Sequence, residues 1–143
     1  MKKFAKITAV ALVAVLALAA LVACGPASDP KKAEKALKDK KYAVTAVVGA
    51  DGALVQTGLD VTAKAMGLEA GDLIATVNAT NGEEGIMIYY FKNASVARGY
   101  WNDHKEDREK LLEEAKKNDK DLVIKISGSM IYQGTSQAVK DAR

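Results

Sequence analysis

The feature that most constrains this chain is a long apolar run near its start, which ends at the only cysteine. Residues 7–23 contain one polar residue, Thr8, and Cys24 follows them directly. An apolar stretch behind a short basic segment is typical of an export signal rather than of a globular core. The folding unit should therefore begin after residue 23, and it must fold without an internal disulfide because the chain has no second cysteine.

Two other interpretations of residues 1–23 are open. A transmembrane anchor usually needs about 20 apolar residues, and this run is slightly short and rich in alanine. An ordinary secretory signal would end in an Ala-x-Ala cleavage site. This run ends in Leu21-Val22-Ala23-Cys24 instead.

That quartet resembles the lipobox of bacterial lipoproteins, in which a leucine, a small or apolar residue and an alanine or glycine precede a cysteine. The resemblance implies that residues 1–23 are a helical signal peptide and are removed. It also implies that Cys24 becomes the N-terminus and carries a diacylglycerol on its sulfur, with fatty acids such as palmitate. The protein would then be held on the extracytoplasmic face of a bacterial cell membrane. The alternative is a buried or spare cysteine in an uncleaved anchor.

Composition constrains the part that follows. Residues 1–23 hold three lysines and no acid, and without them the chain carries equal numbers of basic and acidic residues. A balanced charge favours no polyanionic partner, so nucleic acid is not expected. Residues 24–30 contain both prolines and are predicted to be a lipidated tether, and residues 31–143 are predicted to form a single α+β domain.

Hydrophobic periodicity and turn residues predict the elements of this domain. We expect helices at 31–41 and 60–66, a long helix that Asn93 caps and Asn118-Asp119 ends, and a short helix after Thr135. Strands are expected at 42–48, 72–79, 85–91, 122–126 and 129–133. This order contains the βαββαβ sequence of ferredoxin-like folds, with an extra strand and terminal helices. An antiparallel sheet with helices on one face is the expected architecture.

The two central strands are predicted to form a hairpin about Asn81-Gly82, a typical two-residue loop. With that loop, Val77 lies opposite Ile86, Ala75 opposite Ile88 and Leu73 opposite Tyr90. This hairpin and residues 131–135 (IYQGT) resemble small uncharacterised lipoproteins of Gram-positive bacteria. That resemblance implies no known activity.

Residues that could carry chemistry are few. With one histidine and one cysteine, no metal site is expected, and no cofactor motif is present in the sequence. His104 falls on the apolar stripe of its helix beside Trp101, so a packed histidine is favoured over a general acid–base. No catalytic residue is assigned.

Aromatic residues offer the other candidate site. Tyr89 and Phe91 on one strand, with Tyr132 on another, would form a ligand-stacking surface if their sheet face is open, or core if helices cover it. Three functions follow: a small extracytoplasmic ligand-binding module, a structural or protein-interaction lipoprotein of the cell envelope, or an envelope hydrolase using His104. The ligand or protein partner is not identified by the sequence.

Overall fold

The computed structural model describes residues 25–143; the expected signal peptide with its helix, and Cys24, lie outside the described residues. A single antiparallel sheet has the strand order β1-β2-β3-β5-β4. The strands are β1 (Ala43–Val48), β2 (Leu73–Thr80), β3 (Gly85–Phe91), β4 (Val123–Ser127) and β5 (Met130–Gly134). The helices are α2 (Pro30–Asp39), η1 (Gly49–Asp51), α3 (Ala53–Ala65), α4 (Ala94–Asp103), α5 (Lys105–Lys117) and α6 (Ser136–Asp141). The α+β class and the antiparallel sheet are confirmed.

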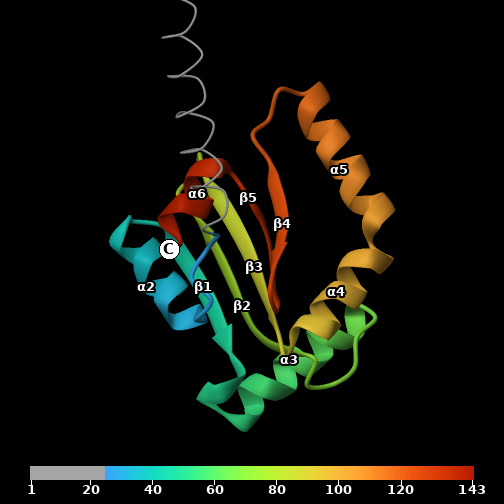
Figure 1. The fold of residues 1–143 in the computed structure, drawn as a ribbon. Coiled ribbons are helices and arrows are strands. Elements are labelled where there is room, and N and C mark those ends of the chain that lie inside the picture. Colours follow the sequence, from blue (N-terminus) through green and yellow to red (C-terminus); the bar gives the residue numbers. More distant parts are fainter. Residues whose placement is uncertain (1–24) are drawn as a thin grey trace, which may run out of the picture.

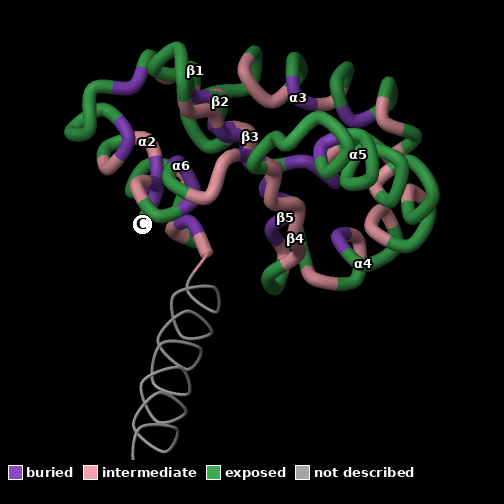
Figure 2. The backbone as a smooth tube through the Cα atoms, turned by 90° about the horizontal axis from the view of Figure 1, so that it is seen from above, coloured by how far each residue is buried: buried purple, intermediate pink, exposed green. Residues whose placement is uncertain are grey.

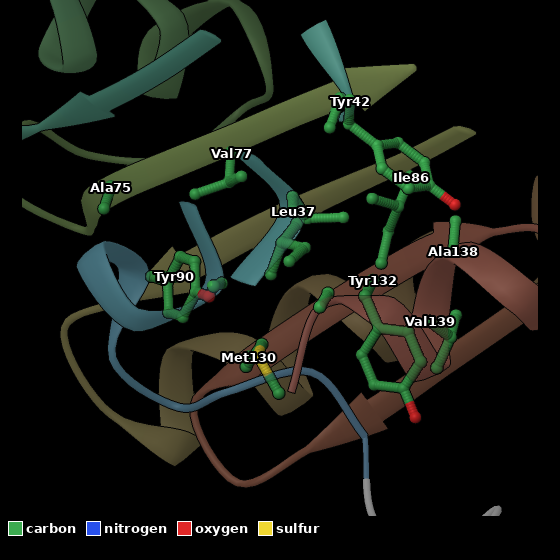
Figure 3. Packing of buried hydrophobic residues seen from close by; sticks show 14 of the residues in the cluster. Leu37, Tyr42, Ala75, Val77, Ile86, Tyr90, Met130, Tyr132, Ala138 and Val139 are labelled. Carbon is green, nitrogen blue, oxygen red and sulfur yellow. The ribbon is translucent and has the colours of Figure 1, made fainter. Parts of the chain in front are cut away.

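Helices cover both faces of this sheet, so the expectation of one covered face is wrong. Figure 1 and Figure 2 show α2 and α6 on one side of the strands and α3, α4 and α5 on the other. We call the side under α2 and α6 the inner face and the opposite side the outer face. Figure 3 shows Leu37 of α2 converging with sheet residues such as Ile86, Tyr90 and Tyr132 on the inner face.

The composition of β3 explains the second layer of helices. Ile86, Ile88 and Tyr90 point to the inner face, where all three are buried. The alternate residue Phe91 points to the outer face, where it packs with Leu59 of α3 and Ala97 of α4. A strand that is apolar on both sides must be covered on both sides, because apolar surface left in water costs about 25 cal/mol per Å².

The connections match the ferredoxin-like order only in part. β3 and β4 each pair antiparallel with β5 between them, so β3-α4-α5-β4 is a split βαβ unit. β1 and β2 instead lie side by side and antiparallel, although α3 connects them. Helix α3 therefore does not cross over the sheet to reach a parallel strand. It lies across the sheet end where β1 finishes and β2 begins (Figure 1).

The central hairpin has a longer loop than the sequence predicts. Val77 pairs with Ile88 and Ala75 with Tyr90, a register two residues away from the expected one. Asn81 causes the difference, because its side-chain oxygen accepts hydrogen bonds from the backbone N–H groups of Glu83 and Glu84 and so extends the turn. A two-residue shift leaves each side chain on its expected face.

Leu73 is the exception in this hairpin. The register shifts between Leu73 and Ala75, so Leu73 pairs with Phe91 rather than with Tyr90. A bulge of this kind turns the preceding side chain to the other face. Leu73 consequently joins Leu59 and Ala63 in the outer cluster.

The long predicted helix is two helices. His104 ends α4 and precedes α5 with backbone angles of φ −106° and ψ 25°, outside the helical region. Helix α5 thereby leaves the direction of α4 and runs beside β4 (Figure 1). The amide of Arg108 still bonds to the His104 carbonyl, so the joint stays compact.

The remaining predictions differ from the structure mainly at element ends. Helix α3 begins at Ala53, well before the predicted residue 60, and the last two strands begin and end one residue later than predicted. Asn93 and Thr135 are N-caps, as the sequence suggests: their side chains accept from the amides of Val96 and Ala138. Among residues 25–143, no helix has both the length and the hydropathy that crossing a bilayer requires.

The predicted tether is part of the domain over its described residues. Pro26 is buried, and Pro30 already belongs to α2. The Ala27 amide donates to the Ala142 carbonyl at 2.8 Å, and the Ala27 carbonyl accepts from the Tyr90 hydroxyl at 2.8 Å. Residues 25–27 therefore lie against the inner face, and Asp29 caps α2, so this segment is not a free linker.

Gly134 should be intolerant of any side chain. A Cβ at this position would lie 2.8 Å from Ile86 Cα and still closer to the Gly85 carbonyl oxygen, both of which are backbone atoms of β3. We expect Gly134→Ala to lower the free energy of unfolding by about 1–3 kcal/mol, as overpacking does. Gly99→Ala is the matched control, because Gly99 is in α4 with open space around it.

The control should raise stability by roughly 0.5–1 kcal/mol, since alanine favours a helix more than glycine does. Urea denaturation followed by circular dichroism measures both changes. Equal stabilities for the two variants would contradict the close pairing of β3 and β5.

Candidate functional site

Two rows of side chains cross the outer face, one residue from each strand. The strand registers align Thr45, Asn78, Met87, Gln133 and Ile124 in the first row. They align Val47, Thr76, Tyr89, Ile131 and Ile126 in the second row. The second row lies nearer α3 and α4 and is mostly apolar. The first row places two amide side chains on either side of Met87.

Helix α5 forms a wall beside the first row. Leu111 of α5 and Leu122, which precedes β4, line a groove together with Asn78, Met87 and Gln133. The groove has a volume of about 350 Å³, and Thr80 lies at its far end. Of the described residues that line it, none carries a charge. This part of the outer face can therefore take an uncharged group that presents both apolar surface and hydrogen-bonding atoms.

A smaller recess of about 130 Å³ continues the groove under the joint between α4 and α5. Leu111 and Gln133 line both volumes, so the recess adjoins the groove. Trp101, His104 and Arg108 line the recess from the helix side. The chain's single tryptophan therefore lines a recess that adjoins the groove.

Arg108 fixes the position of this tryptophan. Its guanidinium carbon lies 3.5 Å from the centre of the Trp101 ring. Its Nη1 also donates to the Trp101 carbonyl at 2.6 Å. A guanidinium over an indole is among the stronger cation–π pairs. The pair holds α5 against the end of α4 and lines the recess beside the groove.

His104 is half-buried in the same joint. Its ring stacks on Tyr100 with 4.1 Å between ring centres, and its Nδ1 lies 3.0 Å from the Tyr100 carbonyl. A carbonyl can only accept, so Nδ1 carries the hydrogen of this bond. Asp107 lines the same recess without a hydrogen bond to the ring among the described contacts. His104 therefore packs in the joint between α4 and α5. Among the described contacts, no carboxylate is hydrogen-bonded to its ring, as a general acid–base would require.

The aromatic residues predicted to bind a ligand do not form one surface. Tyr132 points to the inner face and is buried under α6. Phe91 points to the outer face, where α3 and α4 bury it. Tyr89 alone is half-exposed, and its hydroxyl contacts Met87 Sδ at 2.7 Å. Only Tyr89 therefore lies beside the groove, in the row next to Asn78 and Gln133.

The groove residues that sequence reasoning missed are Asn78, Gln133 and Leu111. The sequence carries one signal for the first two, because each is polar within a strand whose neighbours are apolar. Their juxtaposition depends on β5 inserting between β3 and β4, which no local pattern reveals. Leu111 falls within the single long helix that the sequence predicts, whereas the structure breaks this helix at His104 and leaves Leu111 46% exposed.

An ion pair links the start of β2 to the end of β3, at the end of the sheet away from this groove. Lys92 Nζ lies 2.6 Å from Asp72 Oδ1, and the Lys92 amide donates to the Asp72 carbonyl. The hydrogen bond from Lys92 lowers the pKa of the Asp72 carboxyl. A hydrogen bond from the backbone N–H of Glu69 lowers it further. This buried carboxylate is thus paired, which favours a structural role where β2 begins and β3 ends.

No group of three or more potential metal-ligating side chains converges anywhere in residues 25–143. No protein-family model matches the chain, and comparisons with curated proteins and with solved structures find no significant match. The site is therefore interpreted from its own residues.

Removing the Arg108 guanidinium should loosen the recess beside the groove. We expect Arg108→Ala to shift the Trp101 emission to longer wavelength, because the ring loses its cover and becomes more hydrated. The free energy of unfolding should fall by about 1 kcal/mol, the scale of one such contact with its hydrogen bond.

Arg98→Ala is the control, since Arg98 lies exposed on α4. Fluorescence spectra and urea titrations of both variants make the comparison. An unchanged Trp101 spectrum in Arg108→Ala would contradict the stacked geometry.

Proposed function

We propose that this protein is a lipid-anchored, extracytoplasmic binding module of a bacterial cell envelope. Its outer-face groove would take a small uncharged ligand that contains amide groups, such as a short peptide. The observation that carries the binding role is the row Asn78–Met87–Gln133, in which two carboxamides flank one apolar side chain at the bottom of an uncharged groove.

The chemistry of this row favours amide-containing ligands. Each carboxamide offers a donor and an acceptor, which match the N–H and C=O of a peptide group. Met87 between them is an adaptable apolar side chain that can accommodate different ligand side chains. The volume of about 350 Å³ is at the small end of the range typical of ligand pockets, roughly 300–1,000 Å³.

The proposed anchor rests on the sequence Leu21-Val22-Ala23-Cys24 and the basic and apolar segments before it. A thiolate is the side chain best suited to alkylation by a lipid donor. Two acyl chains on one residue would anchor the protein stably, because one chain alone gives only marginal membrane binding. The small uncharacterised lipoproteins of Gram-positive bacteria remain the proposed relatives of the globular part.

A protein-interaction role is the second candidate, and one observation favours it. Leu54 and Val61 lie two turns apart on α3, with 89% and 66% of their surfaces exposed. Gly58 lies between them on the same side of the helix, so this side of α3 has no charge to oppose an apolar contact. Loss of a co-purified partner in a Leu54→Lys variant, with groove binding unchanged, would favour this role.

The anchor predicts a specific modification. In a bacterial host with the lipoprotein pathway, the full chain should incorporate a fatty-acid probe and fractionate with membranes. Mass spectrometry should find an N-terminal peptide that begins at Cys24 and carries a diacylglycerol. Cys24→Ser should abolish labelling. Recovery of native protein with residues 1–23 attached and the thiol unmodified would contradict the anchor.

The groove predicts selective binding that Trp101 can report. A panel of N-acetylated, C-amidated tripeptides with apolar side chains should contain members that change the Trp101 emission in a saturable way. Asn78→Ala and Gln133→Ala should each weaken that binding by about three- to tenfold, because one hydrogen bond contributes roughly 0.5–1.5 kcal/mol. Asn102→Ala, an exposed amide on α4, is the control. Equal affinities for all three variants would rule out the groove as the site.

A further inference from the structure

The described start of the chain is fixed to the folded domain. The Ala27 amide and carbonyl bond to the Ala142 carbonyl and the Tyr90 hydroxyl, and Pro26 is buried. Gly25 lies directly against Tyr132: a Cβ at Gly25 would be 2.9 Å from the tyrosine hydroxyl oxygen. Consecutive Cα atoms are about 3.8 Å apart. Gly25, to which residue 24 is bonded, is therefore itself part of the packed surface.

This attachment point is on the inner face. Tyr132 packs with Ile88 and Val139 in the inner cluster. The next residue in β5, Gln133, points to the outer face and lines the groove. Successive side chains of a strand point to opposite sides of a sheet. The attachment point and the groove are thus separated by the thickness of one sheet, and they face in opposite directions.

The inner side of the domain near Gly25 carries basic groups on β4, on α6 and at residue 143. Lys125 of β4 pairs in register with Tyr132, so it shares the inner face. Lys140 is exposed on α6, and Arg143 lies two residues beyond the end of this helix. Burial raises the pKa of Tyr132, and the nearby charge of Arg143 partly offsets that rise. Acids also lie near this end: Asp141 accepts from Tyr42 and Gln137, Asp121 accepts from Ser136, and Asp29 accepts from the Lys31 amide.

We propose that the inner-face surface around Gly25, formed by α6 and β4, rests directly on an anionic lipid bilayer, and that the groove opens away from it. This inference depends on the lipidation at Cys24 proposed above. The Cys24 sulfur would lie in the headgroup layer, and Gly25 packs on Tyr132. No flexible linker would then let the domain rotate relative to the bilayer. Lys125, Lys140 and Arg143 then face lipid phosphates, to which basic side chains near a membrane are attracted.

Site-specific fluorescence quenching tests the orientation. The full chain is produced as the lipoprotein with a second cysteine, Lys140→Cys on α6 or Lys116→Cys on α5. Each purified protein is labelled with a thiol-reactive fluorophore and reconstituted into vesicles of phosphatidylcholine and phosphatidylglycerol. The acylated Cys24 takes no label. The vesicles contain a lipid with a nitroxide on its headgroup, which quenches only nearby fluorophores.

We expect the label at residue 140 to be quenched severalfold more than the label at residue 116. In a matched variant, a flexible Gly-Ser insertion after Gly25 should remove this contrast while the lipid stays attached. Equal quenching at both positions of the uninserted protein, or a contrast that the insertion leaves unchanged, would overturn the proposed orientation.

Mass spectrometry of the same samples separates this inference from the anchor itself. A diacylglycerol on Cys24 together with equal quenching contradicts the orientation alone. An unmodified Cys24 contradicts the proposed anchor, and with it the orientation.

Discussion

The fold depends on one strand that is apolar on both of its faces. β3 lies at the centre of the sheet between β2 and β5, and its inner side chains are covered by α2 and α6. Its outer side chain Phe91 is covered by α3 and α4. A sheet whose central strand were polar on one side could leave that side in water, as many antiparallel sheets do. Here both sides must be covered, and the helices are divided between them.

The cover on the outer face is incomplete, and the groove is the part left open. Helix α3 packs at one end of the sheet, where Leu59 and Ala63 meet Leu73. Helix α4 packs beside it, and the break at His104 then turns α5 away along β4. Between these helices the outer face carries Thr76, Asn78 and Gln133, polar groups that tolerate water. The groove therefore lies where the sheet's residues change from apolar to polar.

The sequence predicts the elements of this domain better than their arrangement. Local signals such as the caps Asn93 and Thr135 and the alternation in β2 depend on neighbouring residues, and they identify nearly every element. The pairing of β5 between β3 and β4 joins segments far apart in the chain, so no local pattern contains it. The assignment of Tyr132 to the same surface as Tyr89 failed for this reason: the registers place them on opposite faces. The groove residues Asn78 and Gln133 could not be identified as neighbours until that pairing was known.

Hydrogen bonds near both ends of the domain attach its first described residues to the inner face. The Ala27 amide bonds to Ala142 near the C-terminus, and the Ala27 carbonyl bonds to Tyr90 in the central strand. Tyr42, at the start of β1, donates to Asp141 of α6, and its burial together with this bond raises its pKa to about 12. The described start of the chain and its C-terminal residues are thus hydrogen-bonded to each other on the inner face. A group attached just before Gly25 is consequently attached next to Tyr132 of β5. Because the adjacent residue Gln133 points to the opposite face, the groove faces away from that attachment point.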